Sequence, residues 1–189
     1  MTSAPAFRPL IAALDQAGIP YMVVGSFASN LYGNGRGTQD IDIVMTANAD
    51  QIRAFLSAFP VSQYYFDVEA ALEACRRKSM FNILDMERGW KIDLIFQKTG
   101  AFHQQAFHRR TAAQIDGVDV FALTPEDVII SKLEWTKMGQ SMRQIEDIAG
   151  VLRVQQGKLD HPYIEKWISE LGLAEQWAQA RRLAGVQPT

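Results

Sequence analysis

The sequence predicts an α+β (mixed α/β) fold, in which strands and helices share the first part of the chain and helices alone make up the rest. Hydrophobic residues account for 48% and charged residues for 21% of the 189 positions, which is typical of a packed core rather than of disorder. Apolar runs and alternating patterns indicate strands up to residue 123. Only helical patterns follow, so we divide the chain into residues 1–123 and a C-terminal helical region, 124–189.

Short local signals predict the elements before that boundary. Residues 11–17 predict an amphipathic helix that stops at Gly18 and Pro20. The apolar run at 21–24 predicts a buried strand, which Gly25-Ser26 ends. The elements expected next are a helix over 27–32, a glycine-rich loop over 33–38, a strand over 40–45, a helix over 49–59, strands over 81–85 and 91–96 joined around 87–89, and a hairpin over 115–123 that turns at 116–117.

The boundary itself coincides with a strong helix start. Thr124 is a favourable N-cap, Pro125 suits the first helical position, and Glu126 and Asp127 place negative charge in the first turn. The helices predicted from there on cover 125–138, 142–155, 161–170 and 174–183.

Charge and cysteine content exclude several classes of protein. The formal net charge of −2 argues against broad electrostatic capture of nucleic acid, although Arg76-Arg77-Lys78 and Arg109-Arg110 form local positive clusters. Cys75 is the only cysteine, so neither an internal disulfide nor a cysteine-based zinc site can form, which is typical of the reducing cytoplasm. No apolar run reaches the length of a membrane span, and the first ten residues lack the core of a secretion signal.

The strand over 40–45 carries two acids on one face. Asp40 and Asp42 stand at i and i+2, so a strand turns both to the same side and turns Ile41 and Ile43 to the other. Two neighbouring carboxylates repel each other unless a positive group lies between them, and a divalent cation is the simplest such group. Taken alone, Asp-x-Asp is read more simply as a solvated strand face, because short motifs recur by chance.

A third carboxylate, Asp93, lies among aliphatic residues in the strand over 91–96. If the two strands are neighbours, three carboxylates converge, which is the ligand set of a two-metal phosphoryl-transfer site. Lys91 shares a strand face with Asp93, so it is either the salt-bridge partner of Asp93 or a substrate contact.

Gly25-Ser26 forms a turn between a buried strand and a helix. Glycine permits close approach of a ligand to the backbone, and serine with the free N–H groups of the helix start forms an anion site. A nucleoside triphosphate is a ligand that such a turn accepts.

These residues resemble the nucleotidyltransferase superfamily related to DNA polymerase beta. The pattern of that family is a Gly-Ser turn, a short helix, a strand with Asp-x-Asp and a third acid on a later strand, matched here by Gly25-Ser26, Asp40-Ile41-Asp42 and Asp93. The stretches 23–28 and 36–42 look especially like the toxin-type branch, which includes abortive-infection toxins and relatives in toxin–antitoxin pairs. The resemblance implies a mixed β-sheet flanked by helices, Mg²⁺ with Mn²⁺ as the alternative, and an antitoxin protein as a partner.

That branch also has a phosphate-binding lysine on a downstream helix, followed by an aspartate. Lys132 and Asp147 look like these two residues, so the resemblance spans residues 21–152. From the residues alone, Lys132 either projects toward a phosphate or lays its stem over an apolar surface, and Arg143 could simply pair with Asp147.

Arg36 and Thr38 lie in the loop before the acidic strand, and both are candidate nucleotide-binding residues. Arg36 could hold a phosphate in bidentate fashion, or it could neutralise Asp40 in the empty enzyme.

Together these features predict an enzyme that moves a nucleoside monophosphate from a nucleoside triphosphate to a hydroxyl of RNA, protein or a small molecule. In the predicted mechanism, Asp40, Asp42 and Asp93 hold metal, and Lys132 offsets charge on the leaving group. The alternative is a catalytically silent module that binds a nucleotide or a partner. In that case Trp135, Trp167 and Trp177 would be docking anchors rather than core residues.

Overall fold

The computed structural model describes residues 2–139 and 141–186, which form two compact units. Unit 1 comprises the described parts of Met1–Phe27 and Gly37–Ala122, and unit 2 those of Ala28–Arg36 and Leu123–Thr189. Residues 1, 140 and 187–189 of the two predicted regions lie outside the described residues. The predicted boundary after residue 123 stays a prediction. By packing, the short stretch 28–36 belongs with the helices of unit 2.

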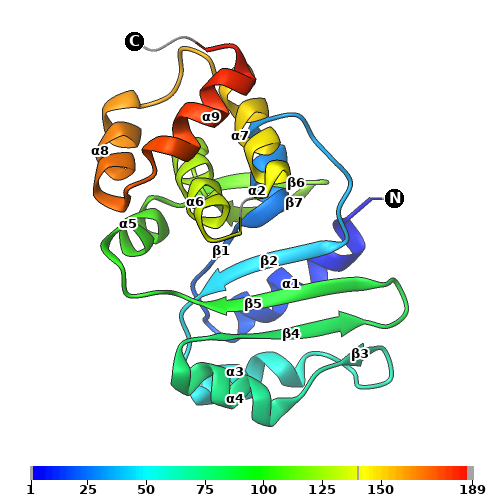
Figure 1. Cartoon of the computed structure of the whole chain (residues 1–189). Helices are drawn as coiled ribbons and strands as arrows, with labels where there is room; N and C mark the ends of the chain where they lie inside the picture. The colour runs from blue at the N-terminus through cyan, green and yellow to red at the C-terminus, as the bar shows by residue number, and fades with distance from the viewer. Residues whose placement is uncertain (1, 140, 187–189) are drawn as a thin grey trace. The chain divides into compact units, whose positions relative to one another are not determined.

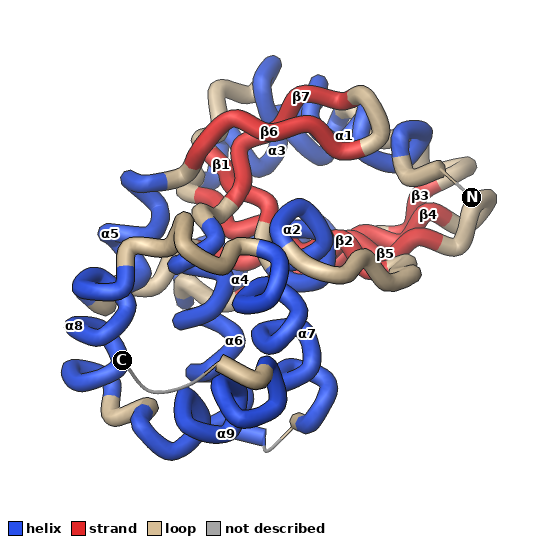
Figure 2. Tube along the Cα trace, turned by 90° about the horizontal axis from the view of Figure 1, so that it is seen from above, coloured by secondary structure: helices blue, strands red, loops and turns tan. Residues whose placement is uncertain are grey.

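Unit 1 contains a mixed sheet of seven strands within its described residues, in the order β3-β4-β5-β2-β1-β7-β6. The pairs β2/β5 and β1/β7 are parallel and the other neighbours are antiparallel. Figure 2 shows β6 and β7 running alongside each other as the terminal hairpin. The strands are β1 (Tyr21–Val23), β2 (Asp40–Met45), β3 (Tyr64–Tyr65), β4 (Met80–Asp85), β5 (Trp90–Phe96), β6 (Thr111–Ile115) and β7 (Val118–Ala122).

Helices α1 (Ala4–Gln16), α3 (Ala49–Ser57) and α4 (Val68–Arg77) pack on one face of this sheet (Figure 1), and α5 (Ala101–Arg109) follows β5. The covered face is apolar because β2 and β5 alternate. Ile41, Ile43, Ile92 and Leu94 are almost fully buried, whereas residues between them are more exposed. The opposite face of β2 and β5 therefore carries the polar side chains.

Helix α1 is longer than the sequence predicts. The prediction of 11–17 was wrong at its start, because the helix begins at Ala4 and includes Pro9. Pro5 occupies one of the first two helical positions, where its missing N–H costs nothing, and burial of Phe7 and Leu10 offsets the bond lost at Pro9.

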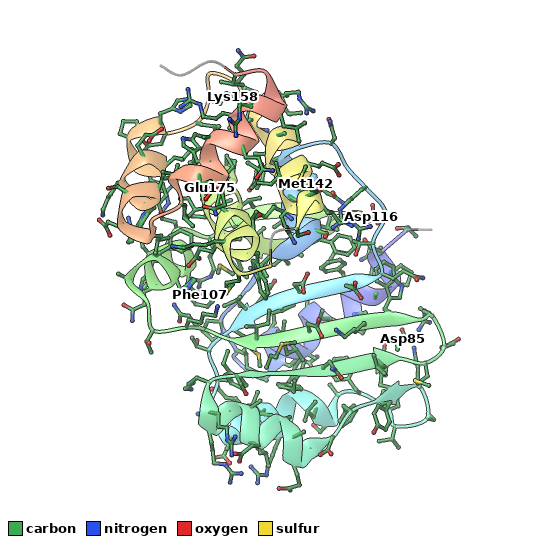
Figure 3. The ribbon with its side chains drawn as sticks, viewed as in Figure 1. Asp85, Phe107, Asp116, Met142, Lys158 and Glu175 are labelled. Atoms are coloured by element: carbon green, nitrogen blue, oxygen red, sulfur yellow. The ribbon has the colours of Figure 1, made fainter. Side chains whose placement is uncertain are left out.

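The β6/β7 hairpin also begins earlier than predicted, at Thr111 rather than residue 115, although its turn lies where expected. Asp116 and Gly117 have φ of 48° and 73°, the left-handed pair that a two-residue hairpin turn requires. The Asp116 carboxylate, labelled in Figure 3, accepts hydrogen bonds from the backbone N–H and the hydroxyl of Ser3, at 2.5 and 2.7 Å. This turn therefore fixes the start of α1.

Unit 2 is helical throughout its described residues, as the sequence predicts. Its helices are α6 (Pro125–Gly139), α7 (Met142–Val154), α8 (His161–Leu171) and α9 (Ala174–Ala184), joined by most of α2 (Gly25–Tyr32). Trp167 and Trp177 are buried core residues, whereas Trp135 is 57% exposed. The α+β class with a helical C-terminal region is thus confirmed.

None of the described helices combines the length and the apolar content that a bilayer crossing requires.

Candidate functional site

The acidic strand β2 turns its two aspartates to the polar face of the unit 1 sheet. Asp40 is exposed and Asp42 half-buried, while Ile41 and Ile43 between and beyond them are fully buried. The alternation that the sequence predicts for residues 40–45 is therefore confirmed, with the same strand bounds.

Strand β5 brings the third aspartate beside the first two. In the parallel pairing of β2 and β5, Asp42 stands directly opposite Asp93, and Asp40 stands opposite Lys91. Adjacent strands lie about 4.8 Å apart and opposite residues share a face, so the three carboxylates lie on one small area of the sheet.

Strand β4 adds a residue to this row that the sequence reasoning missed. Asn82 is the partner of Asp93 in the antiparallel β4/β5 pair, and its side chain is exposed. The turn that joins these strands begins at Asp85, labelled in Figure 3, whose carboxylate accepts the backbone N–H groups of Glu87 and Arg88. The sequence predicts a turn around residues 87–89, and pairing the two strands outward from that turn would have placed Asn82 opposite Asp93.

Gly25 lies directly against the Asp42 carboxylate. A Cβ atom built on Gly25 would stand 2.0 Å from Oδ2 of Asp42, and Gly25 has a φ of +62°. The backbone N–H of Val24 donates to the carbonyl of Asp42 at 2.9 Å, which holds the turn on the strand. Only glycine satisfies both the left-handed backbone and the contact.

Helix α2 starts at this turn, at Gly25. The first N–H groups of a helix have no acceptor within the helix, and the helix dipole adds partial positive charge at that end. The N–H groups of this helix start therefore adjoin Asp42, and anion binding by Gly25-Ser26 stays a prediction.

Lys91 forms an ion pair with Asp93 on the same strand. Its Nζ lies 2.7 Å from Oδ2 of Asp93, and the side chains are 43% and 11% exposed, respectively. This hydrogen bond raises the pKa of Lys91, and the charges of Asp93, Asp40 and Asp42 raise it further against the effect of burial. Of the two roles considered for Lys91, the salt-bridge partner is the one seen.

The other oxygen of Asp93 has no such partner among the described residues. Oδ1 is buried there without a hydrogen bond. An unsatisfied buried acceptor is costly, and its position beside two more carboxylates fits a site for a cation or a hydrogen-bond donor.

The residue types fit a divalent ion of the magnesium kind. Within the part of the chain that the structure describes, no three His, Cys, Asp or Glu side chains converge closely enough to hold one ion by themselves. Mg²⁺ does not need such a cage, because it usually takes one or two carboxylates together with substrate phosphates and water. Asp40 and Asp42 meet that requirement.

A second cluster of predicted residues lies in unit 2. The Nζ of Lys132 is 2.8 Å from Oδ2 of Asp147 and 2.8 Å from Oε1 of Gln144, and the Lys132 and Asp147 side chains are only 5% and 8% exposed. Lys132 thus reaches a buried acid and an amide rather than lying over an apolar surface. Gln144 is a partner that sequence reasoning missed.

Arg36 joins the same cluster. Its Nε lies 3.3 Å from Oδ1 of Asp147, and its backbone N–H and carbonyl both bond to the Asn30 amide. Asp147 therefore pairs with Arg36 and Lys132, whereas the sequence had allowed a pair with Arg143. The two roles considered for Arg36, a phosphate contact or a counter-ion of Asp40, stay predictions.

Thr38 has a local role at the start of β2. Its hydroxyl accepts the backbone N–H of Asp40 at 3.1 Å.

The predicted site residues fall into two sets. Unit 1 holds Gly25, Ser26, Thr38, Asp40, Asp42 and Asp93, and unit 2 holds Arg36, Lys132 and Asp147.

Comparison with known proteins identifies a family. Residues 8–181 match the family model described as "Nucleotidyltransferase of unknown function (DUF6036)". No curated protein sequence matches the chain.

Solved structures share the fold at low sequence identity. The antibiotic-resistance factor ANT(2'')-Ia is 11% identical, with 93% of this chain and 96% of that one covered and a TM-score of 0.57. The lincosamide antibiotic adenylyltransferase LnuA, solved with lincomycin, is 8% identical over 79% of this chain and 98% of that one, with a TM-score of 0.53. An antigenic nucleotidyltransferase-like protein from Paracoccidioides brasiliensis is 16% identical over 91% and 89%, with a TM-score of 0.51.

Proposed function

Because the chain belongs to this family of nucleotidyltransferases, we propose that it moves a nucleoside monophosphate from a nucleoside triphosphate to an acceptor hydroxyl in a reaction that depends on a divalent metal. One observation carries the proposal. Asp42 is opposite Asp93 in the β2/β5 register and touches Gly25, so three motifs far apart in the sequence meet at one place.

Asp40 and Asp42 would hold an ion, Mg²⁺ or Mn²⁺, together with the triphosphate, and Asp93 would complete the site for a second ion. When bound, such ions neutralise phosphate charge and activate the attacking hydroxyl.

The residues of unit 1 perform the remaining tasks. The N–H groups at the start of α2, with Ser26, bind the outer phosphates, and the absence of a side chain at Gly25 keeps the Asp42 carboxylate close to them. The acceptor oxygen forms a bond to the α-phosphorus while the bond from that phosphorus to the bridging oxygen breaks, and pyrophosphate leaves. The Asp93 carboxylate would also help to accept the proton of the hydroxyl. Positioning and charge stabilisation supply most of the catalysis.

The assignment of Arg36, Thr38, Lys132 and Asp147 to nucleotide binding stays a prediction. The same holds for the acceptor (RNA, protein or a small molecule), for a toxin role with an antitoxin partner, and for the cytoplasmic location. ANT(2'')-Ia has been solved with adenylyl-2''-tobramycin and LnuA with lincomycin, which supports testing small molecules beside RNA and protein.

The experiment incubates the purified protein with α-labelled nucleoside triphosphates, Mg²⁺ or Mn²⁺, and total cellular RNA, protein and metabolites. Asp42→Asn removes one charge without changing the shape, and it should lower label transfer at least about 100-fold, the usual loss of one essential electrostatic group. Asp15→Asn, an exposed residue of α1, is the matched control and should leave transfer unchanged. Full transfer by Asp42→Asn would reject the assignment.

Calorimetry with each nucleotide, with and without Mg²⁺, separates this function from a silent binding module. Metal-dependent binding with turnover supports the enzyme. Metal-independent binding without turnover supports the module.

A further inference from the structure

Four charged side chains form a compact group on the polar face of β2 and β5. Asp40 and Asp42 are neighbours along β2, Lys91 and Asp93 are neighbours along β5, and the register sets Asp40 opposite Lys91 and Asp42 opposite Asp93. Three negative charges and one positive charge therefore share one area of the sheet, which we call the acidic quartet.

Lys91 is the cation that this register places within the quartet, and it is engaged with the acid that is most buried. Its ammonium contacts Oδ2 of Asp93 at 2.7 Å, while Asp42 stands beside Asp93 on the next strand. A positive charge at this point lowers the repulsion among three carboxylates.

The same contact places a positive charge on Asp93, the acid proposed to complete the site for a second ion. Of the two oxygens of Asp93, Oδ2 is bound to Lys91, and Oδ1 has no hydrogen bond within the described residues. The Lys91 side chain is 43% exposed, so its flexible stem can carry the ammonium into water when another cation replaces it.

We propose that Lys91 is a built-in counter-ion of the acidic quartet, which stabilises Asp93 in the metal-free protein and which a divalent ion bound at these carboxylates would displace. Lys91 is thus a positioning residue that sets the metal affinity. This inference rests on the proposed function, because it concerns the same carboxylates.

The two alternatives for Lys91 differ in what its removal does to metal binding without nucleotide. A substrate contact would leave the metal affinity of the empty protein unchanged. A competing counter-ion raises that affinity when it is removed, because the divalent ion no longer displaces a positive charge.

The experiment titrates the metal-free full chain with Mn²⁺ in a calorimeter, without nucleotide or acceptor. Lys91→Met keeps the length and loses the charge, and Lys91→Gln keeps a hydrogen-bond donor and loses the charge. Both should bind Mn²⁺ about fivefold more tightly than the wild type, the effect of one partly exposed charge pair. Lys91→Arg keeps the charge and should bind close to the wild-type level. The exposed Lys98→Met, just past β5, is the control for net charge.

Thermal melting gives a second readout. Without metal the Lys91→Met protein should melt below the wild type, and saturating Mn²⁺ should raise its melting temperature by more than that of the wild type. One result would overturn the counter-ion role and leave the proposed function standing. In that result, the wild type binds Mn²⁺, Asp42→Asn abolishes the binding, and Lys91→Met leaves the Mn²⁺ affinity unchanged. No Mn²⁺ binding by any of these nucleotide-free proteins would also overturn the counter-ion role, whereas label transfer that proceeds without any divalent ion would overturn the metal dependence of the proposed function.

Discussion

Replacing Gly25 by alanine should damage the candidate site more than the fold. The new Cβ would stand 2.0 Å from Oδ2 and 2.8 Å from Cγ of Asp42, so the oxygen would have to withdraw by about 1.4 Å to reach an ordinary contact of 3.4 Å. Rotation of the carboxylate alone does not solve this, because Cβ of Asp42 is also only 3.1 Å away. A displacement of about 1 Å in a reacting constellation typically costs about 100-fold in rate.

The backbone adds a separate cost. The φ of Gly25 is +62°, and an alanine held in the left-handed region costs roughly 1–2 kcal/mol. For a chain of this length, that lowers the melting temperature by about 2–8 °C.

Gly89→Ala is the matched control for the Gly25→Ala variant. Gly89, in the β4/β5 turn, has a φ of +72°, and no atom of the described residues lies within 4 Å of the point where an alanine methyl group would stand. The control therefore carries the backbone strain without the collision. Transfer of α-labelled nucleotide and thermal melting should show similar losses of stability in both variants, and a large loss of activity only in Gly25→Ala. Equal activities of the two variants would refute the argument that Gly25 serves to bring Asp42 close.

Three further predictions concern stability and pH. Lys132→Met leaves the buried Asp147 without its closest cation and should lower the free energy of unfolding by about 3–5 kcal/mol in urea denaturation. The double variant Lys132→Met with Asp147→Leu should recover most of that loss. A Lys132→Met protein as stable as the wild type would contradict the contribution of the buried pair. The hydrogen bonds from Ser3 lower the pKa of Asp116, so the stability that Asp116 contributes is present above its unfolded pKa of about 3.9 and is lost as pH falls through the lower folded value. In the Asp116→Asn protein, the melting temperature should therefore change less with pH in this acid range. A pH profile identical to that of the wild type would count against the contact. Burial lowers the pKa of His103, so the stability of the protein is not reduced by His103 above the unfolded pKa of about 6.5 and falls as pH drops toward the lower folded pKa. His103→Gln should remove this pH dependence from melting temperatures measured between pH 5 and 7. If the dependence persists in the variant, other groups cause it.

The strands of the site could be predicted from the sequence, but their register could not. The alternation in residues 40–45 defines both ends of β2, because acids and aliphatics need opposite environments. That Asp42 stands opposite Asp93 depends on how two distant segments align their apolar faces within the whole sheet. No local signal fixes that alignment.

Elements with weak or conflicting local signals were mispredicted or missed. No helix was predicted over residues 4–10, where Pro9 lies inside the helix and removes a backbone hydrogen bond that the burial of Phe7 and Leu10 offsets. Helix α4 was not predicted, although Asp67 caps it and it buries Leu72 and Cys75 one turn apart. Helix α5 and the two-residue strand β3 offer still less periodicity.

The partners of the charged residues in unit 2 were beyond sequence reasoning for a similar reason. Arg143 is one turn from Asp147, so it was the natural local partner. Arg36 reaches Asp147 across 111 positions because Asn30 holds its backbone in place, and a pattern search along one helix cannot find it.

The pairing of β2 with β5 ties the chemistry of this protein to its core. If the β5 strand shifted by one residue against β2, Ile92 and Leu94 would turn outward, and Lys91 and Asp93 would be buried against the helices. A misaligned strand pair would therefore lose stability together with the arrangement of the aspartates. The alignment depends mainly on the buried aliphatic side chains of the inward face. In the proposed enzyme, a change at an exposed position such as Asn82 would therefore alter the site and leave the scaffold that aligns the aspartates intact.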